Sequence, residues 1–172
     1  MNVFNLEIKA RTDNADHVRR KLYEHGADYR GKDHQIDTYF EIKSGRLKIR
    51  EGNIEKSLIY YERENIADPK GSKVLLYNTE RVDELKHILL RVLDVKVIVD
   101  KIREIYFIEN VKFHIDTVNS LGEFIEIEII NTDDTININR MRELCHFYMR
   151  EFNILEKHLI HVSYSDLILS NL

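Results

Sequence analysis

Charged residues at alternate positions recur along this chain, and the sign of the charge differs from one segment to the next. One segment places Arg46, Lys48 and Arg50 between apolar residues, and another places Glu126 and Glu128 in the same way. In an extended strand, side chains two positions apart point to the same side. Three stacked cations repel one another, which predicts that an anion binds between them. Two adjacent carboxylates predict a bound divalent cation, since such ions prefer oxygen ligands.

Three further segments show the same alternation of charged and apolar residues. Their charged members are Glu7 and Lys9, then Lys101 and Arg103, and finally Lys112, His114 and Asp116. Arg and Lys together suit a polyphosphate, because Arg binds it as a two-pronged donor and Lys as a point charge. We therefore expect a polyphosphate together with Mg²⁺ or Mn²⁺. The expected metal ligands are Glu7, Asp116, Glu126 and Glu128.

The alternative is a plain structural β-protein whose charged faces lie in water. Alternation of polar and apolar residues is the ordinary pattern of an antiparallel sheet with one solvated side. A solvated face tends to mix charges of both signs, whereas here the signs separate by segment. The segregation favours a charged interior, and the solvated sheet stays open as the competing interpretation.

The elements that must position these residues are mostly strands joined by short turns. The expected strands are residues 2–11, 33–42, 46–50, 56–63, 72–77, 96–108, 111–118 and 122–130. The expected helices are 16–25, 81–93 and 139–152, with a short one starting near residue 163. Short turns make neighbouring strands antiparallel, and many sequential hairpins favour a barrel. The prediction is an α+β fold with a closed or nearly closed eight-stranded antiparallel β-barrel and flanking helices.

Length, charge and cysteine content exclude several classes of protein. The 172 residues predict a single domain spanning 1–172. Lys and Arg number 26 against 30 Asp and Glu, so the basic excess of a nucleic-acid binder is missing. No apolar run approaches the ~20 residues of a membrane helix, and the first residues lack the apolar stretch of a signal peptide. A lone Cys145 allows no internal disulfide. We expect a cytoplasmic protein.

With these residues in view, the chain resembles the CYTH superfamily, the triphosphate tunnel metalloenzymes, and most resembles its class IV adenylyl cyclase-like branch. The segments that carry the resemblance are 5–9, 35–40, 45–51, 60–63, 69–73, 101–103, 114–116, 121–128 and 163–167. The first of them, Asn5-Leu6-Glu7-Ile8-Lys9, corresponds to the family hallmark Glu-x-Glu-x-Lys. That motif alone is weak, but the ordered series is specific. Asn5 departs from the hallmark and removes one charge from the expected metal site.

The resemblance implies a tunnel of eight antiparallel strands, dependence on Mg²⁺ or Mn²⁺, and a triphosphate substrate, with ATP favoured. The implied catalytic residues are Glu7, Lys9 and Arg63. The implied substrate-binding residues are Lys9, Arg46, Lys48, Arg50, Arg63, Lys73, Lys101 and Arg103. The resemblance also leaves a homodimer open.

Three activities remain open at this point. An adenylyl cyclase would form cyclic AMP and pyrophosphate from ATP. A triphosphatase would hydrolyse inorganic triphosphate, thiamine triphosphate or a nucleoside triphosphate, with Lys9, Tyr39 or Tyr61 positioning the water. A non-catalytic binder of polyphosphate or nucleotide is suggested by Asn5.

Overall fold

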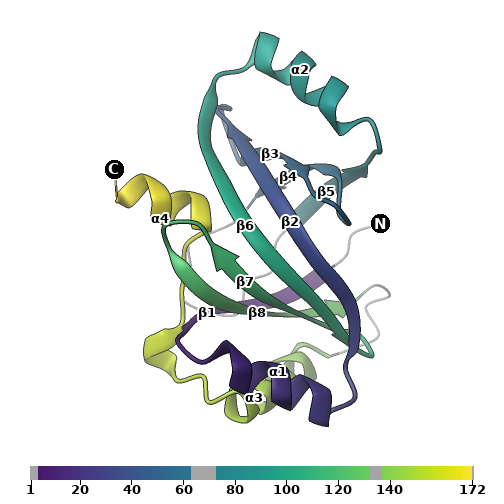
Figure 1. Ribbon diagram of the computed structural model, residues 1–172, viewed down its shortest axis with the longest axis vertical. Helices are drawn as coiled ribbons and strands as arrows, with labels where there is room; N and C mark the ends of the chain where they lie inside the picture. Colours follow the sequence, from purple (N-terminus) through teal and green to yellow (C-terminus); the bar gives the residue numbers. More distant parts are fainter. Residues whose placement is uncertain (1–3, 63–72, 132–136, 172) are drawn as a thin grey trace.

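The computed structural model of the protein describes residues 4–62, 73–131 and 137–171. Its centre is an eight-stranded antiparallel sheet that curls around an interior space (Figure 1). The strands are β1 (Phe4–Thr12), β2 (Asp28–Phe40), β3 (Arg46–Glu51), β4 (Ser57–Glu62), β5 (Lys73–Asn78), β6 (Val95–Ile108), β7 (Val111–Val118) and β8 (Gly122–Asn131). Their order is β1-β8-β7-β6-β2-β3-β4-β5, so β1 and β5 form the two edges. This confirms the predicted α+β fold in its nearly closed form.

Four α-helices flank the sheet, and all four were predicted. They are α1 (Ala15–Glu24), α2 (Val82–Val92), α3 (Ile138–Glu151) and α4 (Tyr164–Ser170). A 3₁₀ turn at Glu156–His158 was not predicted. None of the described helices is long and apolar enough to cross a membrane. The cytoplasmic location stays a prediction, and the fold leaves the homodimer open.

The long strand β2 begins five residues earlier than predicted. The residues Asp28 to Lys32 lack apolar alternation and therefore gave no strand signal. They are nevertheless paired with the end of β6, from Asp28 opposite Phe107 to Lys32 opposite Glu104. A register shift between Tyr29 and Gly31 accommodates the irregularity. Tertiary pairing thus extends β2 beyond its sequence signal.

The apolar side of β1, β7 and β8 faces outward, where α1 and α3 cover it (Figure 1). Its buried members include Leu6, Ile8, Val111, Phe113, Ile115, Ile125, Ile127 and Ile129. They pack with Val18 and Leu22 of α1 and with Met141, Cys145 and Tyr148 of α3. Because side chains alternate along each strand, the charged residues of these strands must point the other way, into the curl of the sheet.

Helix α2 covers the outer side of β3, but its contact stripe is narrower than predicted. Val82, Leu85 and Leu89 pack against Phe40 and Ile49, as expected. Ile88 and Val92, which the pattern placed on the same side, are 62% and 69% exposed. Successive helical residues are about 100° apart, so Ile88 points well away from the stripe centred on Leu85 and Leu89.

Candidate active site

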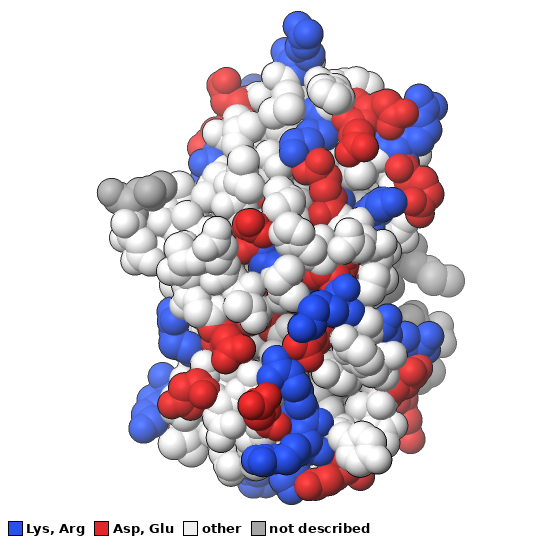
Figure 2. Space-filling view, viewed as in Figure 1, with Lys and Arg blue, Asp and Glu red and all other residues white. Residues whose placement is uncertain are grey.

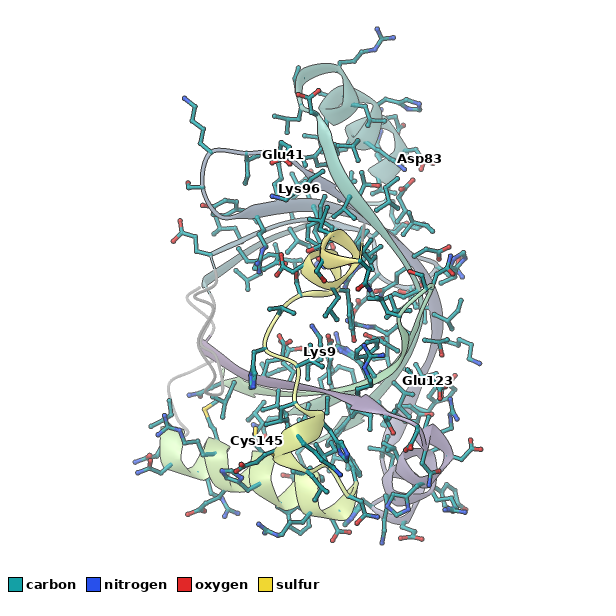
Figure 3. The ribbon with its side chains drawn as sticks, turned by 90° about the vertical axis from the view of Figure 1, so that its left-hand side faces the viewer. Lys9, Glu41, Asp83, Lys96, Glu123 and Cys145 are labelled. Carbon is teal, nitrogen blue, oxygen red and sulfur yellow. The ribbon has the colours of Figure 1, made fainter. Side chains whose placement is uncertain are left out.

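The strand register brings the predicted charged residues together inside the curled sheet. Lys9 lies opposite Glu126 across β1 and β8, and Glu126 lies opposite His114 across β8 and β7. Arg103 lies opposite Asp116 across β6 and β7. Figure 3 shows Lys9 pointing from β1 into the interior of the curl. The interior holds a cavity of about 190 Å³.

Most of the predicted site residues line this cavity. They are Glu7, Lys9, Lys48, Arg50, Lys101, Arg103, Glu126 and Glu128. Asp116 is completely buried, and Tyr164 of α4 donates its hydroxyl hydrogen bond to it at 2.8 Å. Arg63 lies outside the described residues, and the side chain of Lys73 is likewise not described.

On the outside, the face in Figure 2 has Lys and Arg interspersed with Asp and Glu, as a solvated surface does. Inside the curl, by contrast, the charged residues of several strands are buried around one cavity. This difference supports the interpretation of the alternating charges as an interior site.

Asp37 of β2 is the centre of a basic cluster on one wall. Its Oδ2 accepts from Lys48 Nζ at 2.7 Å and from Lys101 Nζ at 2.9 Å, and Arg50 Nε donates to its Oδ1 at 2.8 Å. Burial would raise the pKa of Asp37, but the charges of Arg50, Lys101 and Lys48 outweigh it and hold the pKa well below its ordinary value. Three cations thus surround one carboxylate, and the cluster has an excess of positive charge. We refer to Asp37, Lys48, Arg50 and Lys101 as the basic wall.

Within the basic wall, Lys101 is electrostatically distinct. Its side chain is 1% exposed. Burial, opposed by Asp37 and reinforced by Arg50, Arg103 and Lys48, lowers the pKa of Lys101 to about 7. An ammonium group without water is costly, especially among other cations. Lys101 therefore gives up its proton more readily than an ordinary lysine.

A second cluster, centred on Arg103, is charge-balanced. Arg103 donates to both oxygens of Asp116, and its Nη2 also donates to Glu126 at 2.7 Å. Lys9 Nζ lies 3.2 Å from Glu126, and His114 Nδ1 lies 3.0 Å from it. Burial, followed by Arg103, lowers the pKa of His114 to about 4. His114 is therefore neutral at pH 7 and donates from Nδ1 to the Glu126 carboxylate.

The third group is acidic. Glu7 and Glu128 lie directly opposite each other across β1 and β8, and both line the cavity. Burial and then the charge of Glu7 raise the pKa of Glu128. We refer to Glu7 and Glu128 as the acidic rim. Two facing carboxylates in a water-poor cavity fit a divalent cation, which would neutralise both.

The four predicted metal ligands therefore have different surroundings. Glu126 and Asp116 are held by Arg103, Lys9 and Tyr164. Among the residues that the structure describes, no group of three or more His, Cys, Asp or Glu side chains is arranged to hold a metal ion. A cation at Glu7 and Glu128 would complete its coordination with water and phosphate oxygens, which is the usual situation of Mg²⁺.

Sequence reasoning missed a polar network around Asp33 and Glu55, which adjoins the basic wall through Arg50. Asp33 accepts from the backbone N–H groups of Asn53, Ile54 and Glu55 and so fixes the β3–β4 turn. Gly52 is required there, because a Cβ would lie 2.4 Å from the Glu55 carbonyl oxygen. The turn places Glu55 where Arg50 and Lys112 donate to it, at 2.8 and 2.7 Å. The alternation of Asp33, Gln35 and Asp37 in the sequence could have predicted that these three side chains share one face of β2.

At the other end, Arg46 lies beside the C-terminal helix. Its Nη2 donates to Asp166 of α4 at 2.7 Å, and its guanidinium lies 5.9 Å from the ring of Tyr61. Ser163 and Tyr164, at the start of α4, line the cavity. Helix α4 therefore closes part of the tunnel at the Arg46 side.

Comparisons with known proteins agree with this geometry. The CYTH domain family model matches residues 4–164. No curated protein matches the chain. Among solved structures, the PH1012 protein of Pyrococcus horikoshii is similar, with a TM-score of 0.83, 25% identity, and coverage of 95% of this chain and 98% of its own. A Vibrio parahaemolyticus protein, titled "putative adenylate cyclase", has a TM-score of 0.80 at 21% identity, over 98% of this chain and 99% of its own.

Proposed function

Because this chain belongs to the CYTH domain family, we propose that it is a metal-dependent enzyme that converts ATP to cyclic AMP and pyrophosphate, as a class IV adenylyl cyclase-like protein. The observation that supports this most is the basic wall, where three cations surround Asp37 beside an enclosed cavity. An excess of buried positive charge favours the binding of an anionic ligand. A triphosphate supplies that charge.

The arrangement of charge defines how the triphosphate would lie. Lys48 and Arg50 of the basic wall would bind phosphate oxygens, and Arg103 and Lys9 line the same cavity. Glu7 and Glu128 would hold Mg²⁺ or Mn²⁺, which supplies electrophilic stabilisation of phosphate charge when bound. In this orientation the cations stabilise the charge that develops on the departing pyrophosphate.

Lys101 is the residue that we assign to proton transfer. In the cyclase reaction, the 3′-oxygen of ATP forms a bond to the α-phosphorus and the bond to pyrophosphate breaks. The 3′-hydroxyl proton must leave, and the neutral amine of Lys101 accepts it. A pKa of about 7 is suited to this task, since general-base catalysis is most effective when the pKa lies near the working pH.

A triphosphatase is the second candidate, and the cavity size favours it. The cavity volume of about 190 Å³ is less than the ~300 Å³ of small-molecule pockets, so the cavity suits a triphosphate without an organic group. In this reaction, water attacks the terminal phosphorus, the bond from that phosphorus to the bridging oxygen breaks, and the diphosphate part leaves, while a proton of the water passes to Lys101. The same residues would bind the phosphates.

One experiment separates these activities. Purified protein is incubated with ATP, inorganic triphosphate or thiamine triphosphate, with Mg²⁺ or Mn²⁺, and the products are separated by chromatography. Cyclic AMP and pyrophosphate are expected; free phosphate would instead identify a triphosphatase. Binding without product would leave the non-catalytic binder, and absence of both binding and product would refute the proposed function.

A further inference from the structure

The carboxylate of Glu55, in the β3–β4 turn, accepts hydrogen bonds from nitrogen donors of three different strands. Its Oε2 accepts from Arg50 Nη1 of β3 at 2.8 Å and from Gln35 Nε2 of β2 at 2.9 Å. Its Oε1 accepts from Lys112 Nζ of β7 at 2.7 Å. We refer to these donors of Arg50, Gln35 and Lys112 as the Glu55 cradle.

The Glu55 cradle closes one end of the tunnel. In the sheet, β6 and β2 lie between β7 and β3, so a side chain that contacts both β7 and β3 must lie across the concave side. Along β3, Arg50 is at the opposite end from Arg46, which lies beside α4. Among the described residues, the cavity lining includes Arg50 but not Glu55, whose side chain is 26% exposed. The Glu55 carboxylate therefore lies between the cavity and the solvent.

All three guanidinium nitrogens of Arg50 are bonded to carboxylates of the protein. Nε and Nη2 donate to Asp37 at 2.8 and 2.9 Å, and Nη1 donates to Glu55 at 2.8 Å. Asp37 is 1% exposed, so water and ions do not reach its bonds to Arg50. The bond to Glu55 lies closer to the solvent and is the one that an incoming anion can replace. Glu55 thus competes with a phosphate for Arg50.

The Glu55 cradle has donors that suit a phosphate as well as a carboxylate. A guanidinium and an ammonium group bind either anion through strong, charge-assisted hydrogen bonds. Burial would raise the pKa of Glu55, but the charges of Lys112 and Arg50 outweigh it and lower the pKa, so Glu55 is an anion at neutral pH. Asp33 fixes the backbone of the turn through three N–H groups. Release of the carboxylate therefore takes place by rotation of the side chain.

We propose that the Glu55 cradle is a further phosphate subsite, which the carboxylate of Glu55 occupies in the free protein, and that Glu55 thereby limits the length of the polyphosphate chain that the tunnel binds. The inference rests on the proposed triphosphate site and adds the residue at which that site ends. A chain that extends beyond Arg50 meets a carboxylate, and like charges repel. Without this carboxylate, the next phosphate of a longer chain gains Arg50 and Lys112 as donors.

Two glutamates near the end of β3 offer a matched pair of variants. The side chains of Glu55 and Glu51 are 26% and 25% exposed, and each is paired with a lysine. Glu51 pairs with Lys86 of α2, on the outer side of the sheet, so Glu51→Gln removes the same charge outside the tunnel. Glu55→Gln leaves Arg50 bonded to Asp37. Both variants should therefore fold, and thermal melting checks this.

The test measures dissociation constants by calorimetry for inorganic triphosphate and inorganic tetraphosphate, in EDTA so that metal-dependent turnover does not occur. The wild type should bind tetraphosphate no more tightly than triphosphate. Glu55→Gln should bind tetraphosphate about tenfold more tightly than the wild type does, as expected for new charge-assisted hydrogen bonds, with a smaller effect on triphosphate. Glu51→Gln should change neither affinity.

Two further variants make the test specific to the Glu55 cradle. Lys112→Gln in the Glu55→Gln background removes one donor, and the gain for tetraphosphate should be lost. A gain that survives this change overturns the assignment of the cradle as the subsite. Glu55→Asp keeps the charge but shortens the side chain, so it should bind tetraphosphate more tightly than the wild type even if Glu55→Gln does not fold.

The outcomes separate this inference from the proposed function. Binding of triphosphate with no gain for tetraphosphate in Glu55→Gln, or an equal gain in Glu51→Gln, overturns the inference and leaves the triphosphate site intact. Tighter binding of tetraphosphate than of triphosphate by the wild type overturns it as well. Failure of every variant and of the wild type to bind either anion, in EDTA and in Mg²⁺, overturns the proposed function itself.

Discussion

The basic wall and the acidic rim occupy the same tunnel, but they are stabilised in opposite ways. In the basic wall, Asp37 accepts from three cations and its pKa is held well below the ordinary value. In the acidic rim, Glu128 faces Glu7, and burial with this like charge raises its pKa. In the basic wall the like charges are offset by Asp37, whereas the facing carboxylates of the acidic rim would be neutralised by the divalent cation of the proposed function.

This difference shows how the tunnel can be stable before its ligands bind. The cations are held in place by Asp37 and by the Arg103 cluster, so the folded state does not require a triphosphate. The carboxylates of the acidic rim lie at the edge strand β1 and its neighbour β8. Under the proposed function, a metal–triphosphate complex would join the two regions, with its phosphates at the basic wall and its cation at the acidic rim.

The largest expected effect on stability is at Asp37 of the basic wall. Asp37→Ala leaves Lys48, Arg50 and Lys101 buried without their shared carboxylate, and breaking a buried ion pair in this way costs about 3–5 kcal/mol. The melting temperature should fall by about 10 °C, since ~1 kcal/mol corresponds to ~2–4 °C in a chain of this size. Thermal unfolding measures this.

The matched control is Asp100→Ala on the neighbouring strand β6. Asp100 pairs with His34 at 2.8 Å, but both side chains are exposed, and such surface pairs contribute at most ~1 kcal/mol. Addition of triphosphate should restore part of the stability of Asp37→Ala, because the anion replaces the lost carboxylate. Equal melting temperatures for the two variants would show that Asp37 does not hold the basic wall together.

The second prediction concerns the proton-accepting role of Lys101. Lys101→Arg keeps the positive charge but cannot lose its proton, so kcat should fall by about 10²–10⁴-fold while substrate still binds. In the wild type, kcat/KM should rise with pH through about 7, because the amine becomes neutral as pH increases. In the variant, kcat/KM should not show this increase with pH. Rates are measured with saturating Mg²⁺; a variant that retains the increase would exclude Lys101 as the base.

The charged faces and the hairpin pairing of successive strands could be predicted, because both follow from the local sequence. The pairing of β1 with β8 and of β2 with β6 could not. Arg46, Lys48 and Arg50 share a face in any extended strand, and the turns after Glu51 and Ile108 fix the antiparallel neighbours. The partner of each charge could not be predicted. Asp37 is one of several acids on β2, and only the register with β3 and β6 places it against Lys48, Arg50 and Lys101.

Two parts of the site depend on long-range packing and left no local signal. Tyr164 reaches Asp116 across 48 positions of the chain, after α4 has folded back over the tunnel. Glu55 lies in the turn between β3 and β4, and its bond to Lys112 of β7 follows from the curl of the sheet.

The smallest expected effect on stability concerns the acidic rim. Glu128→Gln removes one carboxylate of the acidic rim and so relieves its repulsion with Glu7. Because the folded-state pKa of Glu128 is raised above 4.5, ionisation of this group costs the metal-free protein stability as pH rises above that value. The metal-free variant should therefore be more stable than the wild type at neutral pH, and the two should be equally stable near pH 4, as thermal melting at both pH values measures.

With Mg²⁺ and triphosphate present, the order should reverse. The wild type gains stability from the bound cation, whereas Glu128→Gln offers it one carboxylate fewer and should show a smaller rise in melting temperature. Glu123→Gln is the control, since Glu123 lies on the same strand β8 and pairs with Thr12 at the far end of β1. If Glu128→Gln and Glu123→Gln respond alike to pH and to Mg²⁺, the acidic rim is not the place where the cation binds.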